Sequence, residues 1–208
     1  MAAKELMVIG YPDSFAQDLA AELDGWLLAL PDECDDDALE RWRTNAATGP
    51  SARTVIVCLM PELAASAPVV SIEAGEWQKR AETPLLRWTV ALGVAALSCE
   101  DEGTIIAVTD APTPLDAAAL APEAAIGDAV KALVRSIASS EGKRGVRANT
   151  VTTPARVVAP PVVAPEPPLA GFPGALDEDV SSMIKLLLSG DTAFLTGHCL
   201  SADRGRSW

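Results

Sequence analysis

Few side chains in this sequence have the types and spacing that catalysis or metal binding requires. The single histidine, His198, lies beside Cys199, but no serine or carboxylate is spaced to act with it. A histidine on a strand, with a structural hydrogen bond, is therefore expected. The four cysteines contain no C-x-x-C pair, and a zinc site needs paired thiolates or histidines. We expect reduced and mostly buried thiols instead (Cys34, Cys58, Cys99 and Cys199).

The acidic residues give no stronger signal for a metal. The run Asp35–Asp37 has oxygen ligands for a divalent cation, but it lacks the alternating ligands and the glycine of a Ca²⁺ loop. An acidic run suits the first turn of a helix, because the helix dipole places positive charge there. We therefore expect Asp35–Asp37 to be the solvated start of a helix.

Composition excludes several classes of protein. The net charge is −13, and lysines and arginines do not gather into a patch that could bind backbone phosphates, so no nucleic-acid partner is expected. No apolar run approaches the ~20 residues that span a bilayer. The opening segment, MAAKELMVIG, lacks the pattern of a signal peptide. The sequence predicts a cytoplasmic protein without a membrane partner.

The elements that would position any site alternate along the chain. Short apolar runs typical of buried parallel strands are followed by segments with helical spacing. This alternation predicts an α/β fold with a doubly wound parallel sheet (Rossmann-like), in a single domain over 1–208. The proline-rich segment 154–173 is expected to be a loop or extended arm within it. The predicted strands are 4–10, 26–30, 54–60, 103–110, 146–153 and 195–203; the clearest predicted helices are 14–25, 72–97, 124–140 and 177–190.

Two segments of the carboxyl-terminal half resemble the short-chain dehydrogenase/reductases. KALVRSIASSEGKRGVRANTV, residues 131–151, is similar to the helix and strand that follow the active site in that family. DEDVSSMIKLLLSGDTAFLTGHCLSADRG, residues 177–205, is similar to the family's closing helix, strand and turn. Together they cover about a quarter of the chain, and the amino-terminal half matches only in pattern. Relative to the family, the stretch 31–53 has room for one helix but no further strand, so the resemblance implies a shortened sheet that lacks one strand.

Carried over by position, the resemblance implies a degenerate active site. The family's catalytic tyrosine falls on Glu123 and its lysine on Gly127. The catalytic serine falls on Asp110, and the active-site asparagine aligns near Pro84. In the family, lysine lowers the pKa of the tyrosine so that its phenol can move a proton as hydride is transferred. Two carboxylates without the lysine have the wrong charge to stabilise a developing oxyanion.

The turn that binds the cofactor in the family has changed as well. There, three glycines let the backbone approach the pyrophosphate at a helix N-terminus. Here the turn reads IGYPDSFA: Gly10 is retained, while the other two glycine positions hold Ser14 and Ala16. Pro12 lacks an amide donor, and Asp13 adds a negative charge. The resemblance therefore implies that this chain binds no cofactor.

The resemblance implies that the surface used for subunit assembly is retained although the active site is not. In the family, the helices equivalent to 72–97 and 124–140 pair with a neighbouring subunit. The implied function is that of a non-catalytic subunit supporting a catalytically intact short-chain dehydrogenase, in a heterodimer or heterotetramer whose partner binds NAD or NADP. A hydroxyacyl-CoA or related alcohol is the implied substrate of the complex. The residues expected at the interface are apolar and come from the two helices and the chain end (Trp88, Val130, Val134, Ile137 and Trp208).

Two other functions remain open from the sequence. Glu123 and Asp110 could act as a carboxylate pair in an enzyme of altered chemistry, which would need one carboxyl group protonated at neutral pH. Alternatively, the empty nucleotide cleft could hold a different ligand in a binding or regulatory module.

Overall fold

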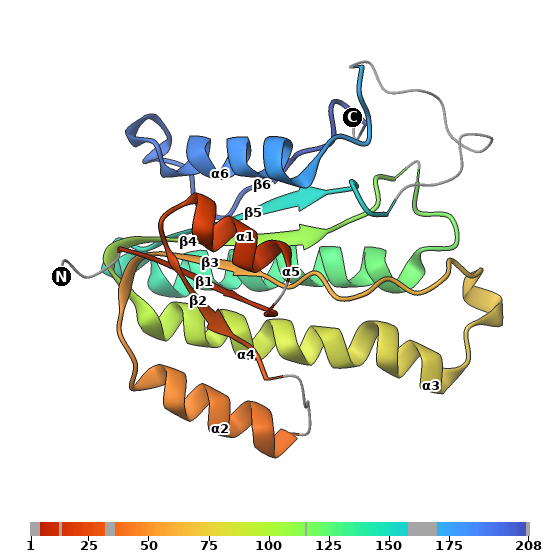
Figure 1. Cartoon of the computed structure of the whole chain (residues 1–208), viewed down its shortest axis with the longest axis horizontal. Helices are drawn as coiled ribbons and strands as arrows, with labels where there is room; N and C mark the ends of the chain where they lie inside the picture. The colour runs from red at the N-terminus through yellow and green to blue at the C-terminus, as the bar shows by residue number, and fades with distance from the viewer. Residues whose placement is uncertain (1–4, 13, 32–35, 115, 158–169, 207–208) are drawn as a thin grey trace.

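The computed structural model describes residues 5–12, 14–31, 36–114, 116–157 and 170–206 (Figure 1). Within these ranges six strands form one sheet, and every pair of neighbours is parallel, in the order β2-β1-β3-β4-β5-β6. The predicted doubly wound α/β fold is confirmed. The strands are β1 (Leu6–Gly10), β2 (Trp26–Ala29), β3 (Ala52–Cys58), β4 (Cys99–Asp110), β5 (Arg147–Thr153) and β6 (Cys199–Ser201).

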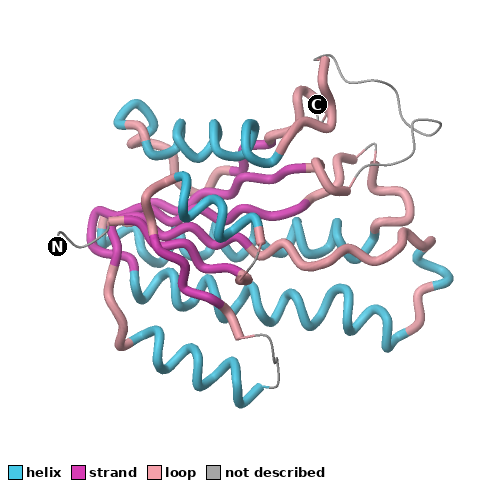
Figure 2. The backbone as a smooth tube through the Cα atoms, in the orientation of Figure 1, coloured by secondary structure: helices cyan, strands magenta, loops and turns pink. Residues whose placement is uncertain are grey.

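Helices cover both faces of the sheet (Figures 1 and 2). The helices α1 (Phe15–Glu22) and α6 (Ser181–Leu188) lie on one face. The other face carries α2 (Asp36–Ala47), α4 (Thr83–Ser98) and α5 (Ala121–Ser140). As predicted, α2 begins within the acidic run. Short helical segments complete the fold: η1 (Val69–Ser71), α3 (Ala74–Trp77), η2 (Gln78–Glu82), η3 (Glu141–Arg144), η4 (Leu176–Val180) and η5 (Gly190–Thr192).

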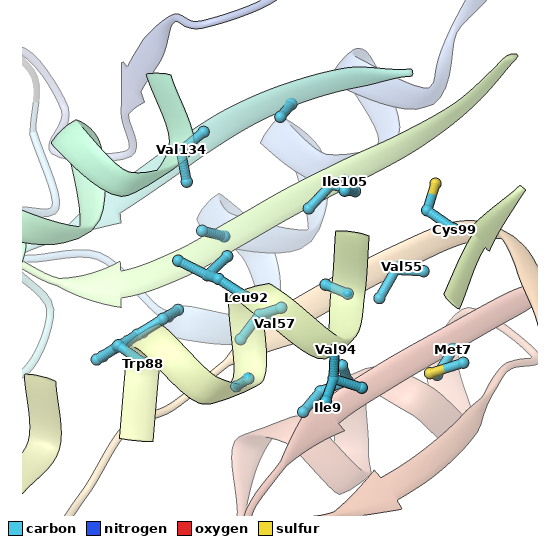
Figure 3. Packing of buried hydrophobic residues seen from close by; sticks show 14 of the residues in the cluster. Met7, Ile9, Val55, Val57, Trp88, Leu92, Val94, Cys99, Ile105 and Val134 are labelled. Atoms are coloured by element: carbon cyan, nitrogen blue, oxygen red, sulfur yellow. The ribbon is translucent and has the colours of Figure 1, made fainter. Parts of the chain in front are cut away.

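The core consists of two apolar layers, one on each side of the sheet. Because side chains alternate along a strand, Met7 and Ile9 of β1 belong to the layer under α4 and α5, whereas Val8 belongs to the layer under α1 and α6. Figure 3 shows the first layer, in which Trp88 and Leu92 of α4 face the strands. Both faces of the central strands are buried, which explains their continuous apolar sequences.

The order of the strands reverses at β1. From β1 the chain first moves outward to β2 and then returns to β3 on the other side, so the connections at the carboxyl ends of β1 and β3 diverge. In open α/β sheets ligands bind at such a switch point. The described residues between β2 and β3 form one helix, α2, and no strand, which leaves β2 at an edge of the sheet, as the shortened sheet predicted.

One continuous helical segment leads to the site. α3, η2 and α4 follow one another without a break, and η2 is a turn of π-helix in which the Thr83 amide bonds the carbonyl of Gln78, five residues back. Pro84, predicted to start or kink a helix, lies in the first turn of α4, directly after the π-helical turn. Turns of this kind are frequent at functional sites.

The carboxyl-terminal segment is held by polar side chains of β5. Arg147 donates to the carbonyl oxygens of Leu187 at 3.2 Å and Thr192 at 3.1 Å, and Asn149 donates to that of Leu195 at 2.9 Å. The matched RAN sequence therefore has a structural role. None of the helices within the described ranges is long and apolar enough to cross a membrane.

Candidate functional site

The β1–α1 turn lies at the switch point of the sheet and is closed by tight packing. A Cβ atom on Gly10 would lie 2.3 Å from the Cβ of Ala16 and 2.7 Å from the carbonyl oxygen of Cys58. Gly10 is therefore needed where helix α1 packs against the sheet, and the small Ala16 side chain forms the other half of this contact. Asp13 of this turn lies outside the described residues.

Ser14 occupies the N-terminus of α1 with its own side chain. Its hydroxyl donates to the carbonyl of Tyr11 at 2.6 Å and accepts from the amide of Ala16 at 3.3 Å, which is an N-cap. Beside the turn, Arg87 donates to the Tyr11 hydroxyl at 2.9 Å, with its guanidinium carbon 5.4 Å from the ring centre. This pair was not predicted. Because the Ala16 amide already donates to the Ser14 hydroxyl, a phosphate could bind this amide only by displacing the Ser14 side chain.

Two of the positions that the resemblance implies to be degenerate, Asp110 and Glu123, lie near one another at the carboxyl end of β4. Asp110 is the last residue of β4, and Glu123 lies in the first turn of α5. Both are buried: 7% of Asp110 and 8% of Glu123 are exposed. Buried carboxylates require counter-charges, and each has an arginine that sequence reasoning missed.

Arg80, on the π-helical turn η2, is the counter-charge of Glu123. Its Nη2 atom donates to Glu123 Oε1 at 2.8 Å, and Nη1 donates to Glu76 Oε1 at 2.9 Å. The exposed fractions of the Arg80 and Glu123 side chains are 7% and 9%. Burial alone would lower the pKa of the Arg80 guanidinium, but the hydrogen bonds and charges of the two glutamates outweigh it and raise that pKa.

Asp110 has a weaker partner. Nη2 of Arg156 lies 3.4 Å from its Oδ2, which is an ion pair without a good hydrogen bond. Burial raises the pKa of Asp110 to about 6; Arg156 works against the shift, and the neighbouring charge of Glu123 adds to it. The same environment, mainly burial, raises the pKa of the Cys58 thiol.

The two arginines also hold the loop that follows β3. Arg80 donates to the carbonyl of Ala65 at 3.1 Å, and Arg156 donates to the carbonyls of Met60 and Pro61. The loop 59–68 is thereby fixed over the carboxyl ends of β3 and β4. The ion pairs of the site and the position of the loop 59–68 therefore depend on the same two side chains, Arg80 and Arg156.

Gly127, where the resemblance would place a lysine, lies where α5 packs against the end of β4. A Cβ atom there would be 2.9 Å from the Cβ of Ala111 and 3.5 Å from the Asp110 carbonyl oxygen. Contacts that close are not found for real Cβ atoms without a shift of the neighbour. A lysine does not fit at this position unless helix and strand move apart.

Pro84 lines the same pocket as Asp110 and Glu123. Proline offers only a carbonyl on its backbone and no polar side-chain atom. The residue of this helical segment that reaches the carboxylates is Arg80, one turn earlier.

The predicted interface residues need correction. Trp88, Val130 and Val134 are at most 1% exposed and pack in the chain's own core against the sheet, so they cannot contact a partner. The stripe in 124–140 that suggested an interface is in part the face that α5 turns to the strands. Ile137 is half-buried against the same core, and Trp208 lies outside the described residues.

His198 directly precedes β6 and does not lie on a strand, contrary to expectation. The His198 ring makes a hydrogen bond with the Thr196 carbonyl at 2.8 Å, and its amide donates to Asn149. In the described part of the chain Cys58 and Cys99 are buried and Cys199 is exposed. No group of three acidic, cysteine or histidine side chains suited to a metal occurs among the residues described.

No family model matches this sequence, and no curated protein matches it. The fold itself is that of the short-chain dehydrogenase/reductases. Such an enzyme from Serratia marcescens superposes with a TM-score of 0.70 at 16% identity, covering 98% of each chain. A putative oxidoreductase from Escherichia coli gives 0.66 at 18%, over 98% of this chain and 96% of that one. BdcA, in complex with NADPH, gives 0.65 at 17%, over 99% and 95%.

Proposed function

We propose that this chain is a degenerate short-chain dehydrogenase/reductase that has no catalysis of its own and supports a catalytically intact subunit of that family. The observation that carries the proposal is the buried Arg80–Glu123 ion pair at the position of the catalytic tyrosine. An Arg80 guanidinium bound by two glutamates cannot act as the acid–base group that the tyrosine phenol provides in the family. The close approach of α5 to the end of β4 at Gly127 leaves no room for the lysine.

The cofactor side supports the same proposal. Pyrophosphate binding at a switch point relies on free amides and on room for the backbone to approach. Here Ser14 caps the helix, and Gly10 and Ala16 are in close contact. The residues of this turn therefore do not fit a dinucleotide, and NAD or NADP is assigned to the partner subunit.

Cofactor binding can be tested on the isolated chain. We expect no saturable change in the fluorescence of NADH or NADPH up to millimolar protein, because the pyrophosphate would have to displace the Ser14 cap. An intact short-chain dehydrogenase measured alongside provides the positive control. Saturable binding with a micromolar dissociation constant would show that the turn opens, and the non-catalytic assignment would then be wrong.

The outer face of α4, opposite the side that packs on the sheet, is exposed and apolar, and this supports the proposal. Leu86 is 43% exposed and Leu97 is 65% exposed. They share one face of the helix with Val90 and Gly93, at helical spacing. A Cβ atom on Gly93 would meet nothing within 4 Å, so another helix can approach closely there. We infer that this face, rather than the buried residues first expected, contacts the catalytic subunit in a heterodimer or heterotetramer.

Co-expression with the intact dehydrogenase encoded nearest to this chain tests the assembly. We expect the two chains to copurify and Leu97→Arg to abolish copurification, because a guanidinium cannot be buried between apolar helices without a partner charge. Leu186→Arg, on α6 at the opposite side of the sheet and 46% exposed, is the matched control and should leave the complex intact. Equal loss in both variants, or in neither, would contradict the assignment of this face.

A further inference from the structure

A small cavity remains at the centre of the degenerate site. It lies at the carboxyl ends of β3 and β4, and its walls also come from η2, α4, α5 and the loop after β3. Its apolar lining includes Leu59, Leu63, Trp88 and Ile126. The cavity volume, counted as the space open to the centre of a water molecule, is about 90 Å³. Since a single water needs roughly 10–15 Å³ of such space, the cavity has room for a compound of several heavy atoms.

Three carboxylate oxygens in this cavity have no hydrogen-bond partner. Oε2 of Glu123 and both oxygens of Asp110 are buried and accept no hydrogen bond. Both residues line the cavity. A buried acceptor without a donor costs about 1–3 kcal/mol, and more when it is charged. The site therefore has an excess of acceptors that a donor-rich ligand would satisfy.

The charges of the site add up to a negative value. Two guanidinium groups, of Arg80 and Arg156, face three carboxylates, of Glu76, Glu123 and Asp110. The remaining charged side chains of the lining, Lys79 and Glu62, are exposed and have opposite signs, so they cancel. With Glu76 included, whose side chain is 42% exposed, these groups leave one negative charge without compensation, which favours a cation and disfavours an anion.

We propose that this cavity binds a small organic cation, an alkylammonium group whose N–H donors meet Glu123 Oε2 and Asp110. Its alkyl part would lie against Leu59 and Leu63. The ring of Trp88 also lines the cavity, and the faces of aromatic rings attract ammonium groups. The apolar lining suits an organic cation better than a metal ion, and the described residues offer no cluster of three metal ligands. All lining residues belong to one chain, so the site does not depend on the proposed assembly.

Calorimetric titration of the isolated chain with n-butylammonium chloride tests the site, with 1-butanol and sodium butyrate as matched neutral and anionic compounds. We expect saturable binding of the cation, binding of the alcohol weaker by about tenfold or more, and no binding of the anion. No saturable binding would mean that the cavity holds only water, and the proposal would be overturned. Equal binding of the alcohol, or tighter binding of butyrate, would overturn it as well.

Asp110→Asn and Glu123→Gln separate recognition from packing, because each preserves the size of the side chain and removes its charge. Each should weaken n-butylammonium binding by about tenfold or more while the circular-dichroism spectrum stays that of a folded protein. Unchanged affinity in both folded variants would contradict the role of the carboxylates. Leu97→Arg should bind the cation normally, so the failure of the assembly proposal and the failure of this one are distinguishable.

Discussion

Replacing Arg80 with alanine is expected to lower the free energy of unfolding by about 3–5 kcal/mol. The substitution leaves the Glu123 carboxylate 8% exposed and without its counter-charge, and it also removes the hydrogen bond to the Ala65 carbonyl. Removing one partner of a buried ion pair is costly because the other charge stays desolvated. Equilibrium unfolding in urea at neutral pH, followed by circular dichroism, measures the loss.

Two companion variants show that the loss belongs to the buried pair. Arg80→Met combined with Glu123→Leu removes both charges at similar volume and should cost much less than Arg80→Ala alone. Arg43→Ala breaks an exposed pair with Glu40, whose side chains are 51% and 60% exposed, and should cost less than about 1 kcal/mol. If Arg80→Ala cost no more than Arg43→Ala, the site would be open to water and the buried pair would not exist.

Gly127→Ala is expected to destabilise the fold although alanine is the better helix former. The new Cβ would lie 2.9 Å from the Ala111 Cβ, so α5 and the end of β4 must separate. Overpacking of this kind typically costs about 1–3 kcal/mol. Gly127→Lys should cost more, because its longer side chain starts from the same crowded Cβ position.

Gly93→Ala is the matched control for this prediction. Both glycines lie within helices, but a Cβ at position 93 meets nothing within 4 Å. Here alanine should raise the free energy of unfolding by about 0.5–1 kcal/mol, the ordinary difference in helix propensity. Opposite signs at the two positions in urea unfolding are the expected result, and a stabilising Gly127→Ala would refute the close approach of helix and strand.

Much of the fold could be predicted because its signals are local. Buried parallel strands are continuous apolar runs, such as Val55–Cys58, and amphipathic helices repeat their apolar positions at every turn. The stretch between β2 and β3 is too short for a helix and a strand, so the edge position of β2 could also be inferred. The irregular start of β4 was missed: the predicted strand began at 103, whereas β4 begins at Cys99, with a register shift against β3.

The site could be predicted only in part. The positions of Asp110, Glu123 and Gly127 were fixed by short counts from matched segments, but their electrostatic partners lie far away in the sequence. Arg80 and Glu123 are 43 residues apart, and no local pattern announces that contact. A single arginine within an otherwise ordinary helical segment is also common at a surface, so its burial had to come from the structure.

The interface residues show a different limit. The apolar spacing of Val130 and Val134 identified a helix correctly, but periodicity does not say which of two apolar faces meets the sheet. In α5 the sheet takes the face with Val130 and Val134, and Trp88 of α4 packs in the same core. The apolar face that stays outside belongs to α4 and contains Leu86 and Leu97. The sequence shows this face as clearly as the buried ones, but it does not tell which of them is exposed.

The open edge at β2 affects how this protein avoids aggregation. An edge strand presents unpaired backbone groups to any other extended chain and so invites uncontrolled stacking of sheets. β2 has only four residues, its register with β1 is set from Met7 to Gly10, and Pro31 follows two residues after its end. A strand so short, followed closely by a residue without an amide hydrogen, offers a poor template for amyloid growth. The sheet can therefore end at β2, because this strand is too short to act as a seed.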